Sequence, residues 1–315
     1  MGDDVLACYN RRDLILYALG IGCVDQHYIY ENSSDFAAFP TYPACLEFKG
    51  EGCDIVQYPP PGMSFQTEIV GALEGTRAVL DAELAIEQRL PMPAGGCSCS
   101  IACQLTSLER KRSGALVRTA STIRDASGQV LCVLRGAFFA LGAQPTDEQL
   151  VAPPPAGDEL RPQSLPGNPA NRSPDASVEE DISDITAQLY RLSGDYNPIH
   201  IDPTSAQLSG LRGPVLHGRC TLGIAVRHVL ARFGDSDAAR FLSCSARFAK
   251  PFAPGERLLT RMWRDGSEGG RVLFECVVRE GEGERVVLTN GVVELRPSGK
   301  AACRATQPEQ PMSRL

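Results

Sequence analysis

The sequence of 315 residues predicts an α+β fold made of two similar units, each with a helix followed by antiparallel strands. Residues 9–20 and 183–192 are the expected helices, and each precedes a region of short apolar runs that turn residues separate. Residues 143–178 lie between the units. They hold eight of the 23 prolines and no aromatic residue, which is typical of an extended linker. The two halves are alike in pattern, not in sequence.

The apolar runs and turn residues set the limits of each unit. Gly20 ends the first helix, and Ser183 is the expected N-cap of the second. The expected strands are 66–74, 77–88, 101–108, 115–123 and 129–141 in the first unit, and 244–250, 256–264, 270–279 and 284–297 in the second. We therefore expect an N-terminal domain at 1–142, the linker at 143–178, a C-terminal domain at 179–300 and a tail at 301–315.

The composition excludes several classes of protein. A net charge of −7 without a basic stripe argues against nucleic-acid binding. No apolar run approaches the roughly 20 residues that cross a bilayer, and the N-terminus lacks the features of a secretion signal, so we expect no membrane partner. The 12 cysteines are scattered, and we expect free thiols. The sequence assigns no role to the cluster of Cys97, Cys99 and Cys103.

One loop carries the residues of catalytic chemistry. Residues 190–200 read Tyr-Arg-Leu-Ser-Gly-Asp-Tyr-Asn-Pro-Ile-His. Gly194 suits a helix C-cap with positive φ, and Pro198 prevents the helix from continuing. The loop then presents Asp195, Asn197 and His200. A carboxylate and an imidazole can share a water and transfer its proton, while an amide fixes its orientation, so these residue types indicate water activation.

A second segment supplies a site for a developing oxyanion. His217-Gly218 opens a run with helical periodicity that extends to Phe233, which places Gly218 in the first helical turn. The first amides of a helix have no partner inside it and lie at the positive end of its dipole. A glycine there allows close approach of a ligand oxygen, and its amide can stabilise an enolate. Together the two segments indicate addition or removal of water next to a carbonyl.

These residues resemble the signature of the hydratase 2 family, the (R)-specific 2-enoyl-CoA hydratases of the MaoC-like group. The family signature reads approximately Tyr-x-Leu-Ser-Gly-Asp-x-Asn-Pro-aliphatic-His, followed later by a small residue. It runs unbroken from Tyr190 to Ala206, and the Leu-His-Gly at 216–218 matches too. Residues 17–22 and 30–36 are similar to N-terminal landmarks of the eukaryotic members.

The resemblance implies a double hot-dog fold, in which each domain is an antiparallel sheet wrapped around a helix. Only the C-terminal domain carries the catalytic motif, and the N-terminal one accommodates an acyl chain. The implied reaction is reversible syn hydration of trans-2-enoyl-CoA to (3R)-3-hydroxyacyl-CoA, as in peroxisomal fatty acid β-oxidation. CoA belongs to the substrate, and neither a further cofactor nor a metal is implied. Pairing of hot-dog domains predicts a homodimer.

The resemblance also assigns roles to individual residues. Asp195 and His200 hold the water, Asn197 orients the water or His200, and the Gly218 amide stabilises the thioester enolate. Tyr17 and Glu31 correspond to a tyrosine and a glutamate of functional importance, which suggests substrate binding; their alternatives are a core tyrosine and a solvated glutamate.

Four further residues are candidates for substrate binding or for support of the catalytic loop. Arg247 and Lys250 are candidates for the CoA phosphates, although basic strand residues are commonly solvated. Arg191 and Asp202 could form an ion pair that braces the catalytic loop. We expect His217 to be structural. A metal centre would need Asp195, His200, Asp202 and His217, but catalytic zinc commonly uses three close ligands from short motifs, so no metal ligand is predicted.

The chain ends in Ser-Arg-Leu at 313–315, close to the Ser-Lys-Leu tripeptide that the peroxisomal import receptor binds. A chance tail is the alternative. Given the enoyl-CoA chemistry, we expect a peroxisomal location and the import receptor as a partner.

Three other functions stay open. A dehydratase would run the same chemistry in reverse, and a thioesterase on the same fold would attack the carbonyl carbon. An acyl-CoA-binding protein would have lost catalysis, but Asp195, Asn197, His200 and Gly218 are all present. The chain could also be the hydratase part of a larger multifunctional enzyme. Its length and its targeting-like terminus favour a separate protein.

Overall fold

The computed structural model describes residues 4–155, 157–158, 165–167, 169, 172–266, 270–281 and 283–297. The helices are α1 (Arg11–Gly20), α2 (Gln26–Ile29), α3 (Leu46–Lys49), α4 (Ser64–Gly71), α5 (Thr186–Tyr190), α6 (Pro203–Leu208) and α7 (Gly218–Phe233). The strands are β1 (Val5–Tyr9), β2 (Ala78–Gln88), β3 (Cys97–Lys111), β4 (Gly114–Asp125), β5 (Val130–Leu141), β6 (Ala176–Asp181), β7 (Phe241–Phe248), β8 (Arg257–Asp265), β9 (Arg271–Glu280) and β10 (Gly283–Leu295). None of the described helices is long and apolar enough to span a membrane.

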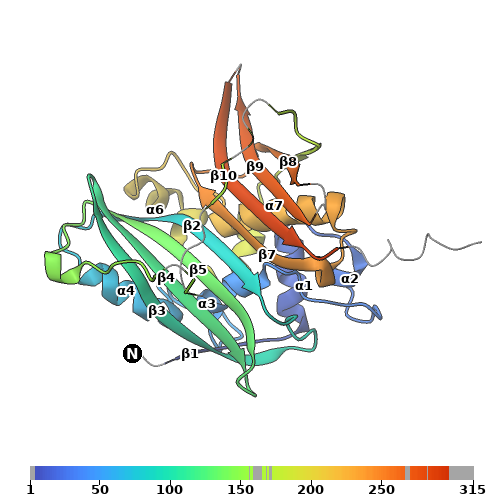
Figure 1. Cartoon of the computed structure of the whole chain (residues 1–315), viewed down its shortest axis with the longest axis horizontal. Helices are drawn as coiled ribbons and strands as arrows, with labels where there is room; N and C mark the ends of the chain where they lie inside the picture. Colours follow the sequence, from blue (N-terminus) through green and yellow to red (C-terminus); the bar gives the residue numbers. More distant parts are fainter. Residues whose placement is uncertain are drawn as a thin grey trace, which may run out of the picture.

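The strands form one antiparallel 10-stranded sheet in the order β1-β3-β4-β5-β2-β7-β10-β9-β8-β6. The order contains the same arrangement twice, because β6 to β10 occupy in their half the positions that β1 to β5 occupy in theirs. The halves join where β2 pairs with β7, from Glu83 opposite Arg247 to Glu87 opposite Ser243 (Figure 1). Each half therefore contributes five consecutive strands to the common sheet, in line with the two similar units that the sequence predicts.

The two halves differ in the helix that covers the sheet. In the second half α7 is 16 residues long, and ten of its residues are buried, among them Leu222, Val226 and Leu230. It packs against β7 to β10 (Figure 1). In the first half the corresponding position, directly before β2, holds α4, which has 8 residues and none of them buried. A short, half-buried helix fills less of the concave face of its sheet, and this difference creates the cavity described below.

The strand predicted at 66–74 is wrong, because this segment forms α4. Its β-branched residues favoured a strand, but β propensity depends strongly on context. Ile69, Val70 and Leu73 lie on one face at helical spacing and pack in a common apolar cluster. The turn at Pro61–Met63 leads directly into the helix.

Two edge strands were missed, and both expected helices are shorter than predicted. The helix expected over 9–20 begins at Arg11, because Tyr9 belongs to β1. β1 lies just before α1, and β6 includes the last residues of the predicted linker. Both are short, and β6 alternates between half-buried and exposed residues, so neither has a long apolar run. The helix expected from Ser183 begins at Thr186, although the Ser183 side chain does accept a bond from the Ile185 amide at 3.4 Å. The cysteines within the described residues are free thiols.

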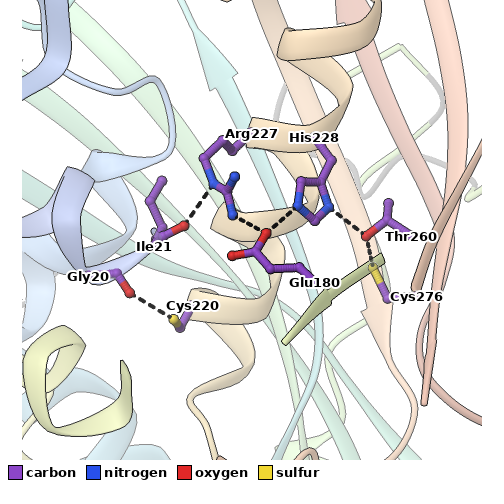
Figure 2. Close-up of polar contacts among 8 residues, drawn as sticks. All are labelled: Gly20, Ile21, Glu180, Cys220, Arg227, His228, Thr260 and Cys276. Atoms are coloured by element: carbon purple, nitrogen blue, oxygen red, sulfur yellow. Dashed lines mark hydrogen bonds and ion pairs between the residues drawn. The ribbon is translucent and has the colours of Figure 1, made fainter. Parts of the chain in front are cut away.

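A polar network ties β6 to α7 and to the end of α1 (Figure 2). The Glu180 carboxylate accepts hydrogen bonds from Arg227 at 2.5 Å and from His228 Nε2 at 2.6 Å. Arg227 Nε also donates to the Ile21 carbonyl at 2.9 Å, and His228 Nδ1 lies 2.9 Å from the Thr260 hydroxyl. Burial lowers the pKa of His228, although Glu180 raises it. One carboxylate thus holds two groups of the long helix against an edge strand.

We expect Glu180→Ala to lower the free energy of unfolding by about 1–3 kcal/mol, because it leaves Arg227 and His228 with buried donors that lack an acceptor. Glu179→Ala on the exposed face of the same strand is the matched control, with an expected change within about 0.5 kcal/mol. Denaturant unfolding of both variants measures the difference. Equal stability of the two variants would contradict a structural role for the network.

Candidate active site

The predicted catalytic loop is held in place by its own backbone. After α5 and a short 3₁₀ turn, Gly194 has a φ of +132°, a conformation that favours glycine. A Cβ on Gly194 would lie 2.7 Å from the Lys49 backbone nitrogen, so the loop packs closely against α3. The Asp195 side chain accepts a bond from the Asn197 amide at 3.2 Å, and the Asn197 side chain accepts one from the Ile199 amide at 3.3 Å. These local bonds satisfy the backbone where Pro198 interrupts regular structure.

His200 has a defined tautomer. Its Nδ1 lies 2.8 Å from the Val215 carbonyl oxygen, which can only accept, so Nδ1 carries the proton. The neutral ring then has an unprotonated Nε2, which can accept a proton. His200 is buried. One of its ring nitrogens lies within 4.8 Å of a carboxylate oxygen of Asp195 and of a ring nitrogen of His217. The structure thus brings together the acid and the base that the loop sequence predicted.

His217 supports this pair, in agreement with the structural role expected from the sequence. Its ring stacks on that of His200, with centroids 3.6 Å apart and an interplanar angle of 25°. Its Nε2 donates to the Asp195 carbonyl at 3.1 Å. His217 is completely buried, and burial together with the neighbouring His200 lowers its pKa well below the usual value. A neutral His217 therefore fixes the His200 ring from one side and the Asp195 backbone from the other.

The stacked rings do not suit a metal ion. The lone pairs of an imidazole lie in its plane, so two nearly parallel rings cannot direct them at one tetrahedral centre. His200 Nδ1 and His217 Nε2 are also hydrogen-bonded to carbonyls. Asp202, the fourth candidate ligand, instead accepts bonds from the Thr204 and Ser205 amides at the start of α6.

Burial shifts the pKa of each catalytic candidate toward its neutral form. Burial raises the pKa of Asp195, although His200, the Asn197 amide and Arg219 lower it. Burial likewise lowers the pKa of His200, although Asp195 and the Val215 carbonyl raise it. An Asp whose pKa is raised is a stronger base than one in water, and a neutral His200 can accept a proton. Both shifts are typical of groups that exchange protons with a substrate.

Gly218 occupies the first position of α7, as predicted. Its amide lies at the positive end of a 16-residue helix and has no acceptor within that helix. Close packing also favours glycine at position 218, because a Cβ there would lie 3.0 Å from the Phe248 ring. Gly218 lies beside the loop that carries Asp195, because His217 directly precedes it and its Nε2 donates to the Asp195 carbonyl.

A cavity of about 250 Å³ lies between α4 and the sheet of the first half. Apolar residues form much of its wall, and Tyr58, Arg219 and Phe248 lie on its wall toward the catalytic loop. Tyr58 interacts with the Asn197 side chain, and burial raises the pKa of Tyr58 to about 12. The lining residues are Glu47, Phe48, Tyr58, Pro59, Met63, Gln66, Thr67, Val70, Val79, Asp81, Glu83, Leu84, Thr119, Ser121, Leu134, Gly136, Ala137, Phe138, Arg219 and Phe248.

The structure does not bring Tyr17 and Glu31 to this site. Tyr17 has no exposed surface; its hydroxyl lies 2.7 Å from that of Thr41, and its ring packs in an aromatic cluster. Glu31 is exposed just beyond α2, in a segment that contacts Ser236 through His27. That contact is beyond the C-terminal end of α7, about 24 Å from Gly218 at a rise of 1.5 Å per residue.

Arg191 and Asp202 do not pair with each other within the described residues. Arg191 lies over the Tyr196 ring at 5.1 Å, and Asp202 caps α6. Arg191 thus contacts a ring within the catalytic loop, and Asp202 caps the helix that follows the loop. The predicted ion pair between them is therefore wrong.

The two basic candidates for CoA phosphates lie on or just after β7. Arg247 is exposed, but its guanidinium pairs with Glu83 across the junction of the two halves, with Nη2 to Oε1 at 2.6 Å. Lys250 is exposed after the strand. Arg285 lowers the pKa of Glu280, and the charges of Lys250 and Arg212 add to this effect.

Three cavity residues were missed from the sequence. Tyr58 and Glu47 lie in irregular or very short elements, and only the three-dimensional fold brings them to the site. Arg219 directly follows the predicted oxyanion donor, so its position in the motif was the one available signal. Its side chain turns to the cavity, and its Nη1 donates to the Ala44 carbonyl at 2.7 Å.

Each half of the chain matches a known domain family. Residues 8–142 match the MFE-2 hydratase 2 N-terminal domain, and residues 166–284 match the MaoC like domain. The chain is 31% identical over 306 residues to the peroxisomal enoyl-CoA hydratase 2 of Arabidopsis thaliana, a match that covers 91% of this chain and 90% of that protein. It is 34% identical over 305 residues to the peroxisomal multifunctional enzyme type 2 of Mus musculus, covering 92% of this chain but 37% of that protein.

Solved structures agree with these matches. The MaoC-like dehydratase from Phytophthora capsici superposes with a TM-score of 0.79 at 36% identity, and the match covers 96% of each chain. On this evidence the chain belongs to the hydratase 2 family of MaoC-like dehydratases, which are hydro-lyases, and has their double hot-dog fold.

Proposed function

We propose that this protein is an (R)-specific 2-enoyl-CoA hydratase, which reversibly adds water to trans-2-enoyl-CoA to give (3R)-3-hydroxyacyl-CoA. One observation carries the proposal: a carboxylate oxygen of Asp195 and a ring nitrogen of His200 lie within 4.8 Å of each other, on a loop beside the N-terminus of α7. The same chemistry in reverse is dehydration.

The acid and base act on one water. Asp195 and His200 Nε2 hold it, and Asn197 helps to orient it. As its oxygen attacks C3, one of the pair accepts its proton, and that proton is delivered to C2. A single water held on one face of the double bond supplies both the hydroxyl and the proton, so the addition is syn.

The negative charge that develops on the thioester needs a donor. Attack at C3 moves electrons through C2 to the carbonyl oxygen and forms an enolate. The Gly218 amide at the start of α7 stabilises this oxygen through its N–H and the helix dipole. The acyl chain then extends past Tyr58 into the cavity, which has the largely apolar lining such a chain requires.

The proposal also covers CoA binding, location in the cell and oligomeric state. Lys250 is a candidate for the CoA phosphates; Arg247 joins it only if it leaves Glu83. The relatives called peroxisomal support a place in peroxisomal fatty acid β-oxidation. The Ser-Arg-Leu at 313–315, the proposed contact with the import receptor, lies outside the described residues. We further propose a homodimer.

The pKa shifts predict an acid limit to activity. The competent state has Asp195 ionised and His200 neutral, so protonation of either group stops catalysis. Because burial lowers the pKa of His200 below 6.5, kcat/KM is expected to be flat near pH 7 and to fall below pH 6.5 as the pair is protonated. A pH profile with a medium-chain enoyl-CoA measures this. A fall that begins above pH 7 on acidification would contradict a neutral, buried His200.

The direct test follows the loss of enoyl-thioester absorbance with trans-2-octenoyl-CoA, together with the release of free CoA. The hydratase proposal predicts loss of the conjugated absorbance while CoA stays esterified. Release of CoA as the main product would instead indicate a thioesterase. Binding without turnover would indicate an acyl-CoA-binding protein.

A further inference from the structure

The cavity that we assign to the acyl chain is not uniformly apolar. Its lining includes Glu47, Ser121 and Arg219, here called the polar cluster. Glu47 comes from α3, Ser121 from β4 and Arg219 from α7, so three separate elements converge on one point. An apolar chain alone does not require these groups, because desolvating charges costs several kcal/mol.

Glu47 is the acid of the polar cluster, and only 4% of its surface is exposed. One carboxylate oxygen, Oε1, accepts a hydrogen bond from the Ser121 hydroxyl. The other, Oε2, lies 3.6 Å from Arg219 Nη1, which is beyond a charge-assisted hydrogen bond of about 2.7–2.9 Å. Oε2 therefore has the charge of Arg219 nearby and keeps room for a donor.

Within the described residues, only some of the N–H donors of Arg219 have an acceptor. Nη1 donates to the Ala44 carbonyl at 2.7 Å, and the guanidinium lies 4.5 Å over the Phe48 ring. Its Nε lies 4.0 Å from Asp81, at the limit of an ion pair. A guanidinium has five N–H donors. Arg219 thus offers further donors next to the open acceptor of Glu47.

A ligand group at this point must both donate and accept. A carboxylate on the acyl chain would meet the charges of Glu47 and Asp81, and an ammonium would meet that of Arg219. A hydroxyl is neutral, donates one hydrogen bond and accepts others, so it can bridge Glu47 and Arg219. An alkyl chain would displace the solvent from these groups and replace none of its hydrogen bonds.

We propose that the polar cluster selects 2-enoyl-CoA substrates whose acyl chain carries a hydroxyl group a few carbons beyond the double bond. The inference rests on the proposed hydratase function and specifies its substrate class. Arg219 directly follows the oxyanion donor Gly218, so the cluster lies near the thioester end of the chain. The apolar side chains of Met63, Val70 and Phe138 line the remainder of the cavity and receive the rest of the chain.

The test compares kcat/KM for trans-2-octenoyl-CoA with that for its analogues hydroxylated at C5, C6 or C7. In the wild type at least one hydroxylated analogue is expected to exceed the parent by about tenfold or more, and an analogue with a carboxylate at that carbon is expected to be the poorest substrate. The double variant Glu47→Leu/Arg219→Leu removes both charges together, which avoids an unpaired buried ion. In the double variant the ratio of kcat/KM for the hydroxylated analogue to that for the parent is expected to fall to about one.

Thr119→Val is the matched control. Thr119 lies on the same wall of the cavity, two residues from Ser121, and its loss should leave the preference unchanged. Thermal unfolding of each variant verifies that it is folded. The inference is overturned if no hydroxylated analogue is preferred, if the carboxylated one is, or if the preference persists in the double variant. Failure of the wild type to hydrate any of these thioesters would instead overturn the proposed function.

Discussion

Asp195→Asn is expected to reduce kcat by about 10²- to 10⁴-fold, the usual contribution of a positioned acid or base. Asparagine keeps the shape of the side chain and can still accept the bond from the Asn197 amide, so the loop geometry should persist. Because burial disfavours the ionised carboxylate, its replacement by a neutral amide should leave the melting temperature equal or higher. Initial rates with trans-2-octenoyl-CoA and thermal unfolding, measured side by side, separate catalysis from stability.

Asp237→Asn provides the control. This aspartate caps a short turn beyond the opposite end of α7, where its side chain accepts a bond from the Ala239 amide. It should retain the wild-type kcat. An Asp195→Asn variant with more than a tenth of the wild-type rate would show that another group activates the water.

Gly194→Ala is expected to have the largest effect on stability, a loss of at least about 2 kcal/mol in the free energy of unfolding. The φ of +132° strains any residue with a Cβ, and that Cβ would lie 2.7 Å from a backbone nitrogen of Lys49. Relief of this contact must move the loop that carries Asp195 and His200, so kcat should fall as well. Denaturant unfolding and initial rates measure the two effects.

Gly213→Ala tests whether the effect is specific to that position. Gly213 has no positive φ, and a Cβ there would have no atom within 4 Å. Its change in stability should stay within about 0.5 kcal/mol. Similar losses at both positions would mean that the close packing of Gly194 on α3 is not what holds the loop.

The features that were predicted correctly depend on local chemistry. Gly194 and Pro198 define the irregular loop because one permits positive φ and the other cannot continue a helix. Gly218 begins α7 because a long apolar periodicity follows it. The long strands β3, β4 and β5 were predicted because their apolar runs end at clear turns.

The features that were missed depend on partners far away in the sequence. The segment 66–74 has the composition of a strand, but its apolar face packs on a cluster contributed by β3, β4 and β5. β1 and β6 are edge strands, and their pairing with β3 and β8 fixes them more than their own residues do.

In the candidate site, too, some residues could be predicted from local motifs and others depend on distant parts of the chain. Asp195, Asn197, His200 and Gly218 come from short motifs, so their proximity was predictable. Tyr17 has the same residue type as a binding tyrosine, and only the packing shows that it is buried in the core. The polar cluster joins residues of α3, β4 and α7, and no local sequence pattern predicts that these elements meet.

In the proposed mechanism Asp195 and His200 deliver one water to one face of the double bond. The most direct measurement is hydration of trans-2-octenoyl-CoA in D₂O, followed by determination of the configuration at C2 and C3 of the product. The expected product has a 3R hydroxyl and deuterium at C2 added from the same face. A 3S product, or deuterium on the opposite face from the hydroxyl, would show that the two groups do not act on a shared water.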